Sequence, residues 1–286
     1  MLETLDLRAS CPRARLKREL PGLQERLRRL QYELREAELP TVVLFEGWDA
    51  AGKSTVIQRL TRCLDPRAFR QFPGAPPSEL EQRYHFLWKY QVRLPEDGQI
   101  AFFDHSWYSR VLVERVEKFV PKTLWKKAFG QINELERWLA EDGQVVVKFF
   151  LHISRKEQRR RLRAMEKDPL ERWKVQKEDW RRNERYGDWV VAIEEMLART
   201  DTPHAPWTVV AGTDFRHLRL TVFRTLVERM EQALRHRRAA PAEVSRTNLA
   251  QAATRGARER RDREEAMLVR SVAREAGLPI EEETAN

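Results

Sequence analysis

Hydrophobic residues recur with a helical period in the first part of the chain. After Pro21, four leucines follow at spacings of four, three and four: Leu23, Leu27, Leu30 and Leu34. This spacing places one apolar stripe along a helix, and proline is favoured at the first helical position because it has no N–H to leave unpaired. We therefore predict an amphipathic helix that begins at Pro21, ends near Pro40 and serves packing or dimerisation.

Short apolar runs of a different kind follow. They are rich in residues that favour strands, and they occupy residues 41–46, 99–103, 144–152 and 207–211. Helical patterns alternate with them, at residues 54–64, 78–93, 121–141, 154–166, 176–199 and 214–235. Strands that are apolar throughout and alternate with helices are typical of a parallel sheet covered on both faces. The pattern predicts an α/β fold of this kind.

The composition is typical of a folded protein of a reducing compartment. The chain has 286 residues, of which 41% are hydrophobic, so it can bury a core. Cys11 and Cys63 are too few for a disulfide framework or a four-cysteine zinc site. No apolar run reaches the roughly 20 residues of a membrane span, no signal peptide is evident, and hydrolase and zinc-binding motifs are absent. We expect a cytoplasmic protein without a membrane partner.

The positive charge is concentrated in one segment. The whole chain has a formal net charge of +10, from 54 Lys and Arg against 44 Asp and Glu. Residues 154–185 hold 13 basic and 7 acidic residues, whereas residues 237–286 hold 10 and 9 and no aromatic residue. The second segment therefore predicts a charged, disordered tail. The first predicts either contact with a polyanion or an ordinary solvated helix face.

A phosphate-binding motif joins the first predicted strand to the next helix. Residues 47–54 read Gly-Trp-Asp-Ala-Ala-Gly-Lys-Ser, which matches the P-loop pattern at every fixed position. The glycines let backbone N–H groups approach phosphate oxygens, Lys53 adds a positive charge, and the Ser54 hydroxyl can bind Mg²⁺. The alternative is a chance glycine turn before a helix.

Two carboxylates accompany this motif. Asp104 ends the apolar run at residues 100–103, and the carboxyl ends of parallel strands meet at one edge of a sheet, so we expect Asp104 near Lys53. The alternative for Asp104 is a helix cap. Asp49 lies inside the loop, where it would repel phosphate unless a cation stood between them, so we predict a second Mg²⁺ contact; the alternative is a turn residue.

Three segments together resemble the polyphosphate kinase 2 family. They are residues 46–53, residues 103–116 with Asp-His-Ser-Trp-Tyr, and residues 167–174 with Asp-Pro-Leu-Glu-Arg-Trp-Lys; Ala-Pro-Trp at 205–207 also fits. The resemblance extends over about residues 25–235. It implies a P-loop kinase fold with a helical lid and Mg²⁺-dependent transfer of phosphoryl groups between inorganic polyphosphate and nucleotides.

The resemblance also implies roles for individual residues. Asp49, Lys53, Asp104 and Arg110 would be the catalytic set, in which Asp49, Asp104 and Ser54 hold the metal. Phosphate and nucleotide would be bound by Gly47, Ala50, Ala51, Gly52, Ser54, Thr55 and Lys89. The lid and polyphosphate residues would be Arg155, Arg159, Arg163, Arg172 and Lys174. The chain departs from the family at Ser54-Thr55, where two glycines are common, and at His105 and Lys89, where arginines are common.

The leading hypothesis is a polyphosphate-dependent nucleotide kinase that acts on AMP or ADP, or on GMP or GDP, with Mg²⁺ or Mn²⁺. One alternative is an NTP-dependent kinase of nucleoside monophosphates or other small molecules, and another is a P-loop nucleic-acid-binding protein. We expect a helical segment at 1–40, a kinase domain at 41–236 with its lid at about 154–185, and a tail at 237–286. We also expect a homo-oligomer and no nucleic-acid partner.

Overall fold

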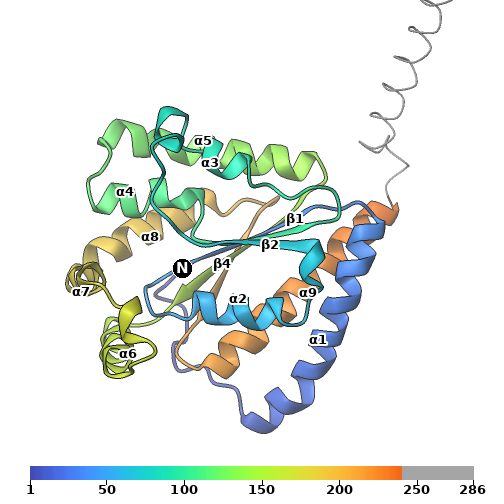
Figure 1. Ribbon diagram of the computed structural model, residues 1–286, viewed down its shortest axis with the longest axis horizontal. Helices are drawn as coiled ribbons and strands as arrows, with labels where there is room; N and C mark the ends of the chain where they lie inside the picture. Colours follow the sequence, from blue (N-terminus) through green and yellow to red (C-terminus); the bar gives the residue numbers. More distant parts are fainter. Residues whose placement is uncertain (240–286) are drawn as a thin grey trace, which may run out of the picture. The chain divides into compact units, whose positions relative to one another are not determined.

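The computed structural model describes residues 1–239 (Figure 1). The predicted tail at 237–286 therefore lies almost entirely outside the described residues. Residues Met1–Arg237 form one compact unit. Within the described part, no helix is both long and apolar enough to cross a membrane.

A five-stranded parallel sheet forms the centre of this unit. Its strands are β1 (Thr41–Gly47), β2 (Phe69–Phe72), β3 (Ile100–Asp104), β4 (Val145–His152) and β5 (Trp207–Ala211). The order across the sheet is β2-β3-β1-β4-β5, and Thr41 of β1 pairs with Ile100 on one side and Val145 on the other. Strands β1, β3 and β4 are buried almost throughout, which explains their continuous apolar runs. The predicted α/β fold is confirmed.

Helices cover both faces of the sheet. They are α1 (Arg13–Glu36), α2 (Lys53–Thr61), α3 (Trp88–Gln91), α4 (Val113–Val116), α5 (Lys122–Glu141), α6 (Arg155–Lys167), α7 (Lys177–Glu184), α8 (Tyr186–Thr200) and α9 (Phe215–Ala239), with 3₁₀ turns η1 (Pro66–Ala68), η2 (Glu81–Arg83), η3 (Trp107–Arg110) and η4 (Arg172–Lys174). Figure 1 shows α4, α5 and α8 on one side of the sheet and α1, α2 and α9 on the other. Helices α6 and α7 lie beyond the carboxyl end of β4.

The predicted helix at 78–93 is wrong. Only the 3₁₀ turn η2 and the single helical turn α3 form there, and Tyr84 between them is extended. The Glu81 carboxylate takes part in holding this irregular segment. It accepts hydrogen bonds from the backbone N–H of Ser78 and from the guanidinium of Arg93. The Tyr84 ring then stacks on Trp88 at 4.3 Å between ring centroids. The segment therefore holds two short turns and a stacked pair of rings instead of a continuous helix.

Two helix boundaries and one strand also differ from the predictions. Helix α1 begins at Arg13, so Pro21 lies inside it. An interior proline costs roughly 3 kcal/mol, and the helix continues through it with Leu20, Leu27, Leu30 and Leu34 buried in the core. The predicted helix at 176–199 is broken at Arg185 into α7 and α8. Strand β2 was not predicted, because it has four residues and only its ends are partly buried.

A buried ion pair joins the sheet to α5. Lys148 of β4 and Glu136 of α5 are both fully buried, with 2.7 Å between Nζ and Oε2. Glu136 also accepts hydrogen bonds from Trp107 Nε1 (3.0 Å) and Tyr108 Oη (2.6 Å). Because each of these buried polar groups has a hydrogen-bond partner, the network holds Trp107 and Tyr108, and with them the segment that follows β3, in place. That segment follows directly on Asp104, the last residue of β3, beside the phosphate-binding loop.

Candidate active site

Glycines shape the loop between β1 and α2. Gly47 has φ +139°, and a Cβ there would lie 2.4 Å from the carbonyl oxygen of Leu151 in β4. Gly52 has φ +106° and precedes the first residue of α2, where the ring of Phe215 leaves no room for a Cβ. Ala50 is also left-handed, with φ +60°. The loop therefore wraps tightly onto the start of a helix, an arrangement that presents N–H groups to an anion.

Lys53 curls back over this loop. Its Nζ donates to the carbonyl oxygens of Gly47 (3.0 Å) and Trp48 (3.1 Å), and the residue is only 7% exposed. A buried ammonium group held by two neutral carbonyls keeps a net positive charge at the loop. Lys53 is thus placed to bind a phosphate.

Ser54 and Asp104 meet next to Lys53, as the sequence predicts. The Ser54 hydroxyl donates to Asp104 Oδ2 at 2.5 Å. The other carboxylate oxygen, Oδ1, is buried without a hydrogen-bond partner. A hydroxyl and a carboxylate oxygen are ligands that hard divalent cations prefer, and the orphaned oxygen fits such an ion. Within residues 1–239, no three His, Cys, Asp or Glu side chains are placed to hold a metal ion together, so an ion at this site would need further oxygens from substrate or water.

Asp49 faces Arg182, which no motif in the sequence marks. Its Oδ2 accepts from Arg182 Nη1 of α7 at 3.3 Å, and Arg182 also lies 4.0 Å from Asp179. Burial raises the pKa of Asp179, and the negative charge of Asp49 raises it further, whereas Lys53 lowers it. The charged groups of Asp49, Arg182, Asp179 and Lys53 are therefore close enough to influence one another electrostatically. Direct metal binding by Asp49 stays a prediction.

Side chains of helix α6 hydrogen-bond to the backbone of the loop. Arg161, 6% exposed, donates to four backbone oxygens: Ala50 (3.0 Å), Ala51 (3.2 Å), Gly212 (2.6 Å) and Thr213 (3.0 Å). Its Nε donates to Glu157, and Gln158 donates to the carbonyl oxygen of Asp49. Burial lowers the pKa of Arg161, and Glu157 opposes that effect. No motif marks these contacts in advance, because Arg161 is one of three consecutive arginines.

Trp48 anchors the other side of the loop. Its ring stacks on Tyr186 at 3.8 Å, and its Nε1 donates to His152 Nδ1 at 2.8 Å. Burial lowers the pKa of His152 to about 4, so the imidazole is neutral and can accept this bond at neutral pH. The tryptophan therefore ties the loop to β4 and α8.

The end of β3 is tied to the strand that carries the loop. Glu46 Oε1 accepts from both the N–H and the hydroxyl of Ser106 at 2.8 Å. Its Oε2 lies 3.2 Å from Nδ1 of His105, which is left-handed at φ +68°. Gly74 packs against His105, where a Cβ would lie 2.8 Å from the ring. These contacts tie the residues that follow Asp104 to β1.

Arg110 and Lys89 form a second group around Glu114. Arg110 Nη1 lies 3.0 Å from Glu114 Oε2, and its guanidinium stacks on Phe86 at 4.6 Å. Arg110 Nε is buried without a partner. Lys89 donates to the carbonyl oxygen of Ala75, and burial lowers its pKa. The roles predicted for these two cations stay predictions.

The five predicted lid residues do not share one surface. Arg155 donates to the carbonyl oxygen of Glu184, and Lys174 pairs with Glu171. Arg159 and Arg163 lie exposed on the side of α6 away from Arg161. Arg172 belongs to η4, where the ring of Trp173 is 69% exposed. Arg155, Arg159 and Arg163 all lie exposed on α6 at four-residue spacing, and their contact with polyphosphate stays a prediction.

Comparisons with known proteins agree on one family. The model of the family Polyphosphate kinase 2 matches residues 11–238. The chain is 40% identical over 233 residues to the polyphosphate:AMP phosphotransferase of Pseudomonas aeruginosa, which covers 82% of this chain and 47% of that protein. It is 37% identical over 228 residues to an ADP-polyphosphate phosphotransferase of the same organism, covering 80% of this chain and 75% of that protein.

A solved structure supports the same relationship. The crystal structure of a polyphosphate kinase 2 from Arthrobacter aurescens TC1 superposes with a TM-score of 0.78 at 27% identity, covering 81% of this chain and 85% of that one. The chain spans about half the length of the polyphosphate:AMP phosphotransferase that it matches.

Proposed function

Since the chain belongs to the polyphosphate kinase 2 family, we propose that it transfers a phosphoryl group between inorganic polyphosphate and a nucleotide. The nucleotide would be AMP or ADP, or the guanine equivalent, and the metal Mg²⁺, with Mn²⁺ as a substitute. One observation carries the proposal: beside Lys53, Ser54 binds one oxygen of Asp104 and leaves the other buried without a partner.

The chemistry follows from charge rather than from a general base. An acceptor phosphate is already ionised near pH 7, so transfer needs alignment and neutralisation of negative charge. A bound Mg²⁺ would neutralise and orient phosphate oxygens, held by Ser54 and Asp104. Lys53 and the N–H groups at the start of α2 would bind the phosphate nearest the loop. Arg110, with its unpartnered Nε, would neutralise charge at the transferring group.

Residues 154–185 would act as a lid over this site. Arg182 already reaches Asp49 across the loop, and Leu170 and Trp173 are 80% and 69% exposed at the far end of the segment. An apolar tip with basic residues beside it suits closure over a nucleotide and its phosphates. Arg172 and Lys174, in the same segment, would then contact phosphate.

Product analysis tests the proposal. The protein is incubated with Mg²⁺ and long-chain polyphosphate together with AMP, ADP, GMP or GDP in turn, and the nucleotides are separated by chromatography. We expect a nucleotide with one more phosphate. Transfer from ATP but not from polyphosphate would favour the NTP-dependent alternative.

Two substitutions test the site itself. Lys53→Ala and Asp104→Asn each remove a charge from the phosphate and metal site, so each should lower turnover by about 100-fold or more. Circular dichroism controls for folding. A variant that keeps more than about a tenth of the turnover would show that its residue does not stabilise the transferring phosphate.

A further inference from the structure

Arg182 of α7 lies near two carboxylates and is bonded closely to neither. Its Nη1 makes a long hydrogen bond of 3.3 Å to Asp49 Oδ2 in the phosphate-binding loop, where about 2.7–3.2 Å is usual. Its Nε lies 3.8 Å from Glu117 Oε1, and both of these atoms are buried without a hydrogen-bond partner. The guanidinium therefore keeps an unused donor next to an unused acceptor.

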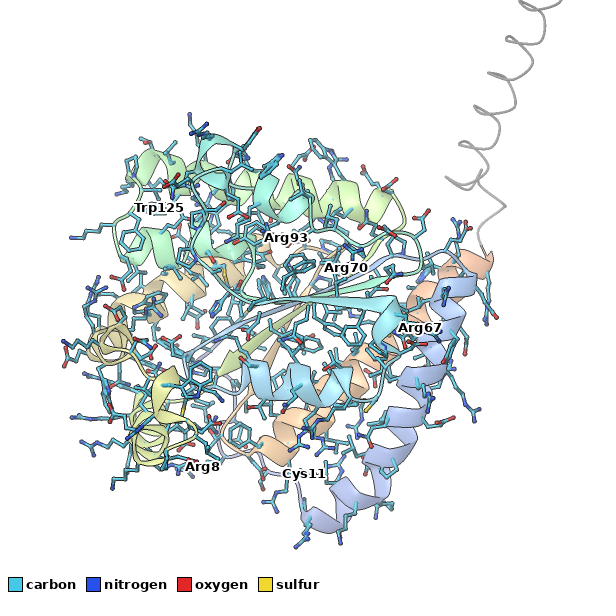
Figure 2. All side chains as sticks on the ribbon, in the orientation of Figure 1. Arg8, Cys11, Arg67, Arg70, Arg93 and Trp125 are labelled. Atoms are coloured by element: carbon cyan, nitrogen blue, oxygen red, sulfur yellow. The ribbon has the colours of Figure 1, made fainter. Side chains whose placement is uncertain are left out.

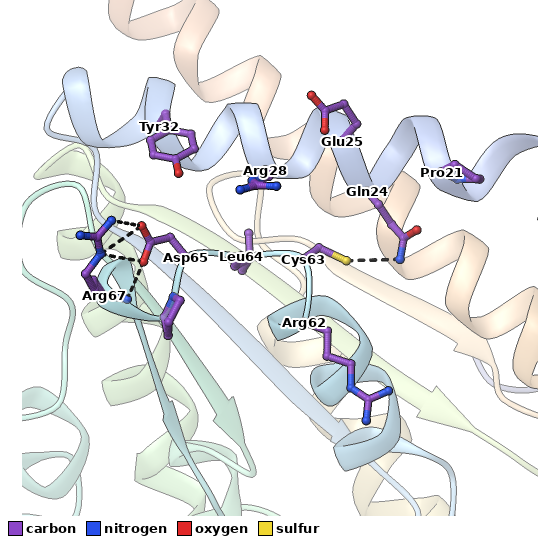
Figure 3. A pocket seen from close by; sticks show the side chains of 11 residues that line it. Pro21, Gln24, Glu25, Arg28, Tyr32, Arg62, Cys63, Leu64, Asp65 and Arg67 are labelled. Carbon is purple, nitrogen blue, oxygen red and sulfur yellow. Dashed lines mark hydrogen bonds and ion pairs between the residues drawn. The ribbon is translucent and has the colours of Figure 1, made fainter.

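Two arginines elsewhere on the chain show the usual close contact with one carboxylate. Arg93, which follows α3 (Figure 2), lies 2.6 Å from Glu81. Figure 3 shows the guanidinium of Arg67 on the carboxylate of Asp65, with 2.7 Å between Nη2 and Oδ2. Arg182, by contrast, is divided between two carboxylates at longer distances. We interpret its position as a compromise between two partners.

Glu117 is held in place at the end of α4. Its side chain is 5% exposed, and its backbone N–H bonds the carbonyl oxygen of Val113. One carboxylate oxygen, Oε2, accepts a hydrogen bond from Arg181 at 2.7 Å. Arg185 lies 3.7 Å from the same oxygen. Because Oε2 is occupied, Oε1 is the oxygen that remains for Arg182.

The backbone of α7 is anchored beside Arg182. Asn183, 2% exposed, donates to the carbonyl oxygen of Arg155 (3.1 Å) and to Gln158 Oε1 (2.9 Å). A change of partner therefore requires movement of the Arg182 side chain rather than of the helix. A shift of about 1 Å would bring its Nε into hydrogen-bond range of Glu117 Oε1.

Asp49 has space beside it for a small cation. Together with Arg182 it lines a hollow of about 30 Å³ next to the loop. A water molecule needs about 10–15 Å³ of such space, so a metal ion fits there. A divalent ion at this carboxylate would repel the guanidinium beside it. Metal and Arg182 would therefore compete for Asp49.

We propose that Arg182 is a built-in counter-ion of Asp49 that Mg²⁺ displaces, and that Glu117 then receives the guanidinium. Glu117 is thus a positioning residue, because it draws Arg182 away from Asp49 and so raises the affinity of the loop for metal. This proposal rests on the proposed function, in which the loop binds phosphate together with a metal ion.

Binding of Mn²⁺ in the absence of nucleotide and polyphosphate tests this exchange. Free Mn²⁺ is measured by electron paramagnetic resonance during a titration, so the result does not depend on catalysis. Arg182→Ala removes the competing cation, and the Kd for Mn²⁺ should fall about threefold to fivefold. Glu117→Gln keeps the size of the side chain but loses the charge that attracts Arg182, so the Kd should rise about threefold.

Double variants separate the exchange from a general effect of charge. In the Arg182→Ala background, Glu117→Gln should have no further effect, because Glu117 acts through Arg182. In the Asp49→Asn background, Arg182→Ala should not lower the Kd. The matched control Lys177→Ala removes an exposed cation from the same helix and should leave the Kd unchanged.

The results decide as follows for the exchange and for the proposed function. Equal Kd values for Arg182→Ala and the unmodified protein, or no binding by either, overturn the exchange. Additive effects of Arg182→Ala and Glu117→Gln, or a gain that persists in Asp49→Asn, also overturn it. If Glu117→Gln does not fold, Arg182→Ala with and without Asp49→Asn still decides. Failure of the proposed function is a separate result, since the unmodified protein would then transfer nothing from polyphosphate, whatever the Mn²⁺ titrations show.

Discussion

Arg161 offers the sharpest test of how this fold supports its phosphate-binding loop. We expect Arg161→Met, which keeps much of the side-chain volume, to destabilise the protein and to impair transfer in the molecules that stay folded. Arg161→Lys keeps the charge but cannot serve four carbonyl oxygens and Glu157 together, so its effects should be intermediate.

The magnitude follows from the contacts. Arg161 is 6% exposed and donates five hydrogen bonds, to the four carbonyl oxygens and to Glu157. Removal of one partner from a buried charged network costs about 3–5 kcal/mol. Folded domains are stable by about 5–15 kcal/mol, so most of the variant should stay folded at 25 °C. Misplacement of the loop by about 1 Å should lower kcat about 100-fold.

Urea unfolding and initial rates measure the two effects. The control is Arg160→Met, since Arg160 is its exposed neighbour and bonds only Glu157; its free energy of unfolding should change by no more than about 0.5 kcal/mol. The reasoning is refuted if Arg161→Met unfolds as the unmodified protein does. Normal kcat per folded molecule, with lowered stability, would show that Arg161 supports the fold but not the loop.

Four further predictions concern the metal requirement, the KM for polyphosphate, the C-terminal tail and the pH dependence of stability. Asp49→Asn should raise the Mg²⁺ concentration for half-maximal activity by about tenfold, and an unchanged titration would make Asp49 a turn residue. Arg159→Ala with Arg163→Ala should raise the KM for long polyphosphate more than that for the nucleotide; equal increases would mean that they hold the lid. Truncation after Ala239 should leave the transfer rate nearly unchanged, because the tail is charge-balanced, and a large loss would contradict this. Burial lowers the pKa of His152 from 6.5 to about 4, so the unfolded chain binds a proton at this residue before the folded protein does. The free energy of unfolding should therefore fall as the pH drops from 6.5 to about 4. If His152→Asn leaves this pH dependence unchanged, His152 is not its cause.

The sequence identifies the parts of the site that depend on local order. Residues 47–54 are contiguous, and the pairing of β1 with β3 brings Asp104 to the same edge of the sheet, so the contact of Ser54 with Asp104 was predictable in kind. The parallel sheet and four of its strands were likewise predictable from apolar runs. Strand β2 was not, because a short edge strand buries too little to show a pattern.

Contacts that depend on tertiary packing were not predictable. Arg161 differs from the arginines beside it only in lying on the buried side of α6, and Arg182 only in lying where α7 meets the loop. The helix predicted at 78–93 was also wrong, because Tyr84 is extended and separates two short turns. The expected homo-oligomer and cytoplasmic location stay predictions.

The position of the loop's anchors along the chain has a consequence for synthesis. The loop is complete once residue 54 has been made, and β1 beside it then has neither neighbour, since Ile100 and Val145 are still to come. Arg161 follows later, and the carbonyl groups of Gly212 and Thr213, which it joins to the loop, come later still. A nascent chain therefore carries its phosphate-binding residues through most of translation before it can hold them in shape. If the loop binds phosphate as proposed, the ligand would stabilise it only after these later residues have left the ribosome, and so would not guide the early steps of folding.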